Sequence, residues 1–206
     1  MSEALPFGPQ RSPVVRELAR KSFHMLSLIY LAVYKLMGWP AALKPMLAWW
    51  ALVVAVEVYR LKSPSANRAL TTFFGGLARE EEHDKLSGIF HTTTGVLILW
   101  LLFGGRDTIV AAGVYYLAFG DAAAALVGKA IGRHKIGASQ KSIEGSAACL
   151  IVCLIVGVML RFPPVAVAAA AVTATVVEFL PTGRWWNDNL WLPVLTAVVL
   201  RLCAAS

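Results

Sequence analysis

The chain has 206 residues, of which 58% are hydrophobic and 15% are charged, and a mean hydropathy of +0.65 excludes a soluble domain of this size. No internal repeat or low-complexity tract divides it, so we expect one integral membrane domain over residues 1–206. The net charge of +7 fits contact with anionic lipid headgroups and requires no nucleic-acid partner.

Residues 1–21 are polar and basic, and they lack the apolar region and small-residue cleavage site of a signal peptide. We expect them to form a cytoplasmic segment ahead of the first membrane helix. A spanning helix needs roughly 17 to 25 mostly apolar residues. Seven segments approach this length, namely 22–39, 44–60, 87–103, 107–128, 143–161, 163–181 and 190–205. The sequence therefore predicts an all-α, multipass transmembrane bundle of about seven helices.

Lysine and arginine are concentrated on one side of this bundle. The N-terminal segment and the second, fourth and sixth loops hold most of the 19 cations, which leaves for the other side Lys35, Lys44, Arg106, Arg161 and Arg201. Because cytoplasmic loops are enriched in Lys and Arg, we expect a cytoplasmic N-terminus. The second loop, residues 60–88, is either a solvated connector or a short interfacial helix seated by Phe73 and Phe74.

Asp121 interrupts the fourth predicted helix, among small residues at positions 120 and 122–125. An Asp near the middle of a spanning helix costs about 2.5 to 3.5 kcal/mol on insertion scales, so it persists mainly where it faces an aqueous cavity or a partner. Gly128 and Gly132 complete a GxxxG spacing that lets helices approach closely. Asp121 is therefore either a functional carboxylate or a buried polar tie in a helix-packing face. Cys149 and Cys153 form no CxxC pair and are expected to be buried as small apolar side chains.

The fourth loop combines glycines with cations. Its candidate phosphate-binding residues are Lys129, Gly132, Arg133, Gly137, Lys141 and Ser142, followed by Glu144 and Gly145 at the start of the next helix. Glycines let backbone N–H groups approach a bound group, and a helix N-terminus carries partial positive charge, so this composition suits a phosphate. The loop matches neither GxxxxGK[ST] nor GxGxxG, and topology alone also predicts a basic loop here.

Further acidic residues are predicted to open on the same face. Glu178 lies in the last apolar turn of the sixth helix, and Asp188 and Asn189 precede the seventh, where they also fit a helix N-cap. Together with Asp121 and Glu144 they would supply the oxygen ligands that Mg²⁺ prefers. Acids that hold a metal and cations that hold phosphates are what phosphoryl transfer requires.

These motifs resemble the polyprenol kinase family, which includes dolichol kinase, phytol kinase and CTP-dependent diacylglycerol kinase. The resemblance lies in RKSFH at 20–24, Asp121 with GKAIGRHKIG, KSIEG at 141–145, and Glu178 with DNLWLP at 188–193. It implies a multipass cell-membrane enzyme whose active site faces the cytoplasm. Such an enzyme moves the terminal phosphate of CTP, or of another nucleoside triphosphate, to the hydroxyl of a lipid alcohol with a divalent metal such as Mg²⁺.

The resemblance also implies which residues act. It carries over Asp121, Lys141, Glu144, Gly145, Glu178, Asp188 and Asn189, with Ser142 where the family usually has Thr. On this hypothesis Lys129, Arg133 and Lys141 bind the phosphates, and Glu178, Asp188 and Asn189 hold Mg²⁺. Asp121 or Glu144 accepts the hydroxyl proton or binds a second metal. His24 and His91 are candidates for contact with the acceptor, although a lone His at a helix end is more often a packed residue.

Two other functions remain open. A cytidylyltransferase that forms a CDP-lipid shares the membrane setting, CTP and the metal, but the sequence lacks the Pro-Gly-His-Gly-Gly and Asp-Arg-x-Asp pattern of phosphatidate cytidylyltransferase. In an ion-coupled transporter, Asp121 and Glu178 would bind coupling ions at the midplane, but no paired broken helices support this. The sequence does not decide between polyprenol, phytol and diacylglycerol, among CTP, UTP and ATP, or between a monomer and a homodimer.

Overall fold

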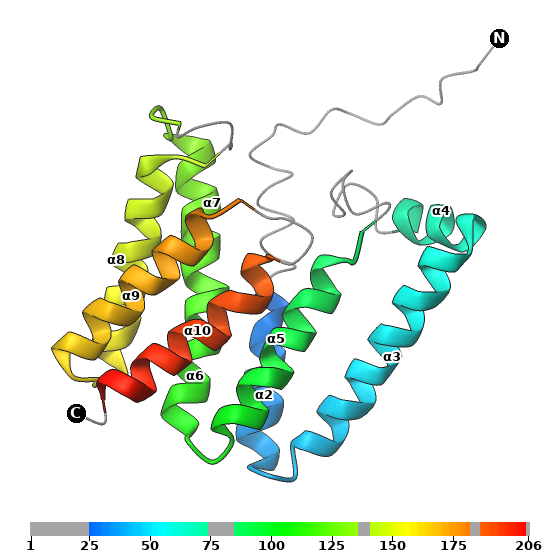
Figure 1. Ribbon diagram of the computed structural model, residues 1–206, viewed down its shortest axis with the longest axis horizontal. Helices are drawn as coiled ribbons and strands as arrows, with labels where there is room; N and C mark the ends of the chain where they lie inside the picture. The colour runs from blue at the N-terminus through cyan, green and yellow to red at the C-terminus, as the bar shows by residue number, and fades with distance from the viewer. Residues whose placement is uncertain (1–24, 74–84, 136–140, 182–185, 205–206) are drawn as a thin grey trace.

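The computed structural model describes residues 25–73, 85–135, 141–181 and 186–204, and these ranges are helical without a strand. The elements are η1 (Met25–Ser27), α2 (Leu28–Met37), α3 (Leu43–Lys62), α4 (Pro64–Phe73), α5 (Gly88–Phe103), α6 (Asp107–Tyr115), η3 (Tyr116–Gly120), α7 (Asp121–Ala130), α8 (Ile143–Met159), α9 (Pro164–Phe179) and α10 (Asp188–Cys203) (Figure 1). The all-α class predicted from the sequence is confirmed.

Each of the seven apolar segments contains one of these helices, counting the stretch from Asp107 to Ala130 as one. An eighth helix, α4, lies in the second loop, where the sequence left a connector or a short helix open. The side chain of Phe73 and all of Phe74 lie outside the described residues, so the interfacial role stays a prediction. The N-terminal segment 1–21, His24 and Gly137 also lie outside them.

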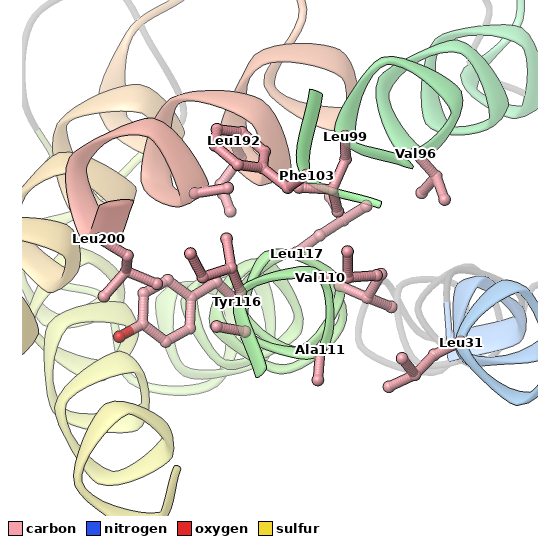
Figure 2. Packing of buried hydrophobic residues seen from close by; sticks show 14 of the residues in the cluster. Leu31, Val96, Leu99, Phe103, Val110, Ala111, Tyr116, Leu117, Leu192 and Leu200 are labelled. Carbon is pink, nitrogen blue, oxygen red and sulfur yellow. The ribbon is translucent and has the colours of Figure 1, made fainter. Parts of the chain in front are cut away.

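The helix from Asp107 to Ala130 forms the centre of the bundle. It runs without a break through α6, the π-helical turn η3 and α7. Val110 and Leu117 are fully buried, and Figure 2 shows them directed into the same interior as Leu99 of α5 and Leu192 of α10. By length and composition, this is the one helix in the described ranges that passes as a membrane span, and 72% of its apolar window is buried inside the protein.

The other helices surround this centre. α10 packs against α9, α5 and α6, and α8 packs between α7 and α9, while α3 lies at one edge against α5 and α4 (Figure 1). Four of the surrounding helices are apolar but only 10 to 17 residues long, namely Met25–Met37, Gly88–Phe103, Ile143–Met159 and Pro164–Phe179. Cys149 and Cys153 of α8 are buried free thiols, as expected, and Cys153 Sγ lies where a side chain at Gly120 would have to go.

Candidate functional site

Lys141 contacts the ends of two helices, α9 and α10, that follow it by about 40 residues in the sequence. Its Nζ atom lies 3.3 Å from Glu178 Oε1 and 3.4 Å from Asp188 Oδ2, and it also donates to the Leu180 carbonyl oxygen at 3.3 Å. The charges of Asp121 and Asp188 both act on the Glu178 carboxylate. Four of the predicted site residues therefore lie in one cluster, which we call the acid–lysine cluster: Asp121, Lys141, Glu178 and Asp188.

Three helices and the segment before α8 position these four side chains. Asp121 begins α7 directly after the π turn, Glu178 is the penultimate residue of α9, and Asp188 begins α10. The three acidic residues are only 5%, 6% and 5% exposed, whereas the Lys141 side chain is 22% exposed. Buried carboxylates are unfavourable unless cations or hydrogen-bond donors neutralise them. The cluster therefore has more negative than positive charge, and Lys141 neutralises part of it.

The donor set of this cluster fits Mg²⁺ in its chemistry. Asp121, Glu178 and Asp188 offer carboxylate oxygens from three different helices, and hard oxygen donors are what Mg²⁺ takes from proteins. No group of three or more His, Cys, Asp or Glu side chains in the described ranges is gathered closely enough to form a metal site. Lys141 Nζ is the cation that contacts Glu178 and Asp188.

The cap of α10 is Asn187. Its side-chain oxygen accepts a hydrogen bond from the Asn189 backbone N–H at 3.0 Å. The capping role considered for Asp188 and Asn189 therefore belongs to the residue before them, because the first turn of α10 begins at Asp188. Asp188 Oδ2 therefore accepts a hydrogen bond from Lys141, while Asp188 Oδ1 accepts one from the Asn189 backbone N–H.

Glu144 binds the hairpin between α7 and α8. Its carboxylate accepts hydrogen bonds from the backbone N–H groups of Arg133 and His134 at 3.1 and 3.2 Å, and lies 2.7 Å from His134 Nδ1. A backbone bridge between Lys135 and Ser142 closes the same hairpin. We expected Glu144 to lie with the other acidic residues, but its carboxylate instead binds the hairpin. Arg133 of this hairpin and Lys129 at the end of α7 are both exposed.

The predicted glycines bring α7 and α8 into backbone contact. A Cβ atom on Gly145 would lie 2.6 Å from the Ala124 carbonyl oxygen and 3.3 Å from Gly128 Cα. Gly132 packs in the same way against Gly128 and Ser142. The Ser142 hydroxyl, 2% exposed, accepts from the Gly145 N–H and caps α8. Close helix packing explains why glycine stands at positions 132 and 145, and helix capping explains Ser142. The contact of these three residues with a nucleotide stays a prediction.

Sequence reasoning missed a buried ion pair on α3. Glu57 and Arg60 are 5% and 6% exposed, and Arg60 Nη2 lies 2.8 Å from Glu57 Oε2. The sequence did contain a signal for this pair, because Glu57 and Arg60 are opposite charges three residues apart at the end of an apolar helix. Glu57 also accepts from the Ser87 N–H, and the Ser87 carbonyl oxygen lies 2.9 Å from Nδ1 of His91, which is partly exposed.

Comparisons of the chain with protein-family models, with curated proteins and with solved structures give no match. The functional argument therefore depends on the acid–lysine cluster, on the hairpin beside it and on the motifs quoted from the sequence.

Proposed function

We propose that the protein is a membrane kinase that transfers the terminal phosphate of CTP, or of another nucleoside triphosphate, to the hydroxyl of a lipid alcohol of the polyprenol, phytol or diacylglycerol class. The observation that carries this proposal is the acid–lysine cluster. Lys141 lies within 3.4 Å of Glu178 and Asp188, and these buried groups come from separate elements. A concentrated mixture of carboxylates and a lysine suits a metal–triphosphate better than it suits packing alone.

A multipass membrane bundle is supported by the outer surface. Large apolar side chains are more than half exposed on several helices, for example Leu52 of α3, Leu101 of α5, Ile155 of α8 and Val172 of α9. Such exposure is unfavourable in water and favourable against lipid tails. Helices of 16 and 17 residues extend only about 24 to 26 Å, so polar residues at their ends would lie at the headgroup level of a bilayer with a core of about 30 Å.

Each residue of the cluster then has a role toward the nucleotide. Glu178, Asp188 and Asn189 would hold Mg²⁺, which when bound neutralises the charge that develops on the transferring phosphoryl group. Lys141 binds the phosphates from its place between the two carboxylates. Lys129 is exposed in the last turn of α7 and Arg133 in the hairpin that follows, and the two meet the outer phosphate oxygens.

Asp121 is the better placed of the two candidates for the proton. Glu144 is engaged by the hairpin, whereas Asp121 acts electrostatically on Glu178 inside the cluster. The lipid hydroxyl gives its proton to the Asp121 carboxylate as its oxygen bonds to the γ-phosphorus, and the bond from that phosphorus to the bridging oxygen breaks to release CDP. Where Asp121 instead binds a second metal, it loses this role.

Product analysis tests the proposal. Purified protein in lipid nanodiscs is incubated with Mg²⁺ and CTP labelled at the γ-phosphate, with phytol, farnesol, polyprenols or diacylglycerol as acceptor. A kinase yields labelled lipid phosphate and CDP from the alcohol. A cytidylyltransferase instead requires a lipid phosphate as acceptor, so a parallel incubation contains phosphatidate, from which such an enzyme yields CDP-lipid and labelled pyrophosphate. Failure of every acceptor with CTP, UTP and ATP, together with ion-driven flux in liposomes, would replace the kinase by a transporter.

A further inference from the structure

The middle of α5 lies directly against the first turn of α10. A Cβ atom on Gly95 would lie 2.9 Å from the Asn189 carbonyl oxygen and 2.7 Å from that of Leu190, so the two backbones touch. Asp188 of the acid–lysine cluster is the residue before Asn189. Residues four apart in a helix share a face and are about 6 Å apart along its axis. His91 therefore lies one turn before Gly95, on the face of α5 that is turned toward the first turn of α10.

The His91 ring is held in one tautomer. Its Nδ1 atom lies 2.9 Å from the Ser87 carbonyl oxygen, and a carbonyl oxygen can only accept a hydrogen bond. Nδ1 therefore carries the proton of the neutral ring, and Nε2 keeps a free lone pair. Across the described ranges, Nε2 has no hydrogen-bond partner. In this tautomer the atom can accept a hydrogen bond from a hydroxyl group.

The Glu57–Arg60 ion pair fixes the carbonyl group that holds this ring. Glu57 Oε2 accepts from the Ser87 N–H at 3.2 Å, and Arg60 Nη2 donates to Glu57 and, at 2.6 Å, to the Lys85 carbonyl oxygen. Both charged side chains are more than nine-tenths buried, so their burial is tolerable only with these bonds made. The pair therefore anchors the segment from Lys85 to Ser87 on α3.

The neighbours of His91 suit a lipid. The Phe90 ring meets the imidazole edge-on with ring centroids 5.6 Å apart, and Ile89 is 44% exposed. Apolar surface beside a hydrogen-bond acceptor matches the end of a lipid alcohol, in which a hydrocarbon chain adjoins a hydroxyl. A nucleoside triphosphate would instead require several donors to its phosphates, and the side chains of Phe90 and Ile89 offer none.

We propose that His91 Nε2 accepts a hydrogen bond from the hydroxyl of the lipid alcohol when the alcohol binds, before that proton passes to Asp121 in the reaction, and that Glu57 and Arg60 are positioning residues that hold the imidazole. The inference rests on the proposed kinase function and names the residue that receives its acceptor substrate.

Two substitutions at His91 test the roles of its two ring nitrogens separately. The amide of Asn can reach the place of Nδ1 and still donate to Ser87, but it leaves nothing at Nε2. The amide oxygen of Gln can reach the place of Nε2. We expect His91→Asn to raise the KM for the alcohol about fivefold to tenfold, the effect of one neutral hydrogen bond, with the KM for CTP unchanged. His91→Gln should restore most of the alcohol affinity, and Glu57→Gln should weaken it in the same direction as His91→Asn.

A second readout makes the result independent of turnover. Each variant is heated in nanodiscs with and without the alcohol and without nucleotide, and Lys62→Met, an exposed change on α3, serves as the control. Alcohol-dependent stabilisation that is lost in His91→Asn and kept in His91→Gln supports the inference. Equal alcohol dependence in wild type and His91→Asn overturns it. If wild type transfers no phosphate to any alcohol, the kinase proposal fails, and the heating experiment still decides whether His91 binds the hydroxyl.

Discussion

Lys141 Nζ lies 3.4 Å from Asp188 Oδ2, although 47 positions separate the two residues. The contact joins the segment before α8 to the first residue of α10, so it forms only when the whole bundle has assembled. It also means that Lys141 has two tasks: it neutralises buried carboxylates in the protein alone, and in the proposed reaction it binds phosphates.

The double task of Lys141 predicts two separable losses. Lys141→Met should lower phosphate transfer by at least about a hundredfold. It should also reduce the stability of the protein without nucleotide by on the order of 2 kcal/mol, because Glu178 and Asp188 lose their cation while Lys141 itself is partly exposed. Thermal unfolding in detergent and a γ-phosphate transfer assay measure the two effects. The exposed Lys62→Met is the matched control, and a Lys141 variant with normal turnover would remove the residue from the site.

Asp121 and Glu144 should respond differently to loss of charge. Asp121→Asn should abolish transfer, because Asp121 belongs to the buried cluster. Glu144→Gln should keep the maximal rate within about threefold and weaken CTP binding, because its carboxylate orders the basic hairpin. Steady-state kinetics at varied CTP gives both numbers. If the two variants lose the maximal rate equally, Glu144 takes part in the reaction itself.

The contact of α7 with α8 predicts that Gly145 tolerates no side chain. Gly145→Ala would place a methyl group 2.6 Å from the Ala124 carbonyl oxygen, so the helices must separate, and we expect a loss of about 1 to 3 kcal/mol. Ala147→Leu, an exposed change two positions along α8, should have little effect. Midpoints of thermal unfolding compare the two. Similar midpoints would show that the helices pack less closely than described.

Tyr34 offers a test of stability away from the site. Its buried hydroxyl donates to Asp107 Oδ1 and accepts from the Gly105 N–H, and Asp107 begins the central helix about 21 Å along the axis from Asp121. Tyr34→Phe should therefore destabilise the protein by about 1 to 2 kcal/mol and leave the KM for CTP and the maximal rate unchanged. Unfolding measurements and kinetics on one preparation check both parts. A changed KM would mean that this end of the bundle is coupled to the cluster.

The proposed membrane orientation predicts which positions a reagent reaches. His134 in the hairpin and Arg161 after α8 lie at opposite ends of that helix. In a Cys203→Ser background, where Cys149 and Cys153 are buried, His134→Cys should react with an impermeant maleimide only in inside-out vesicles. Arg161→Cys should react only in right-side-out vesicles. Labelling of both positions from one side would contradict the multipass arrangement.

The helices were predictable because apolar segments of about 16 residues or more are longer than a typical strand and therefore favour a helix. The neighbourhood of Asp121, Glu178 and Asp188 was also expected. Glu178 and Asp188 stand at predicted helix ends on one face, and a charge inside a predicted membrane helix, such as Asp121, needs a polar partner. The tie from Glu144 to His134 was not expected, because periodicity carries no information about which donor a carboxylate at a helix start will find. The hydrogen bonds that connect Glu57 through Ser87 to His91 were also not predicted, because they depend on long-range packing of α3 against α5.

The π turn Tyr116–Gly120 has no signature in the residue pattern, but it has a consequence for comparing this chain with others. A π turn holds one residue more than the α ladder requires, and one residue corresponds to about 100° of rotation about the helix axis. Changes in loop length therefore leave the orientation of Asp121 unchanged. Deletion of a single residue between 116 and 120 would instead rotate Asp121 about the helix axis relative to α6. An alignment of distant homologues should therefore permit a one-residue gap inside this helix.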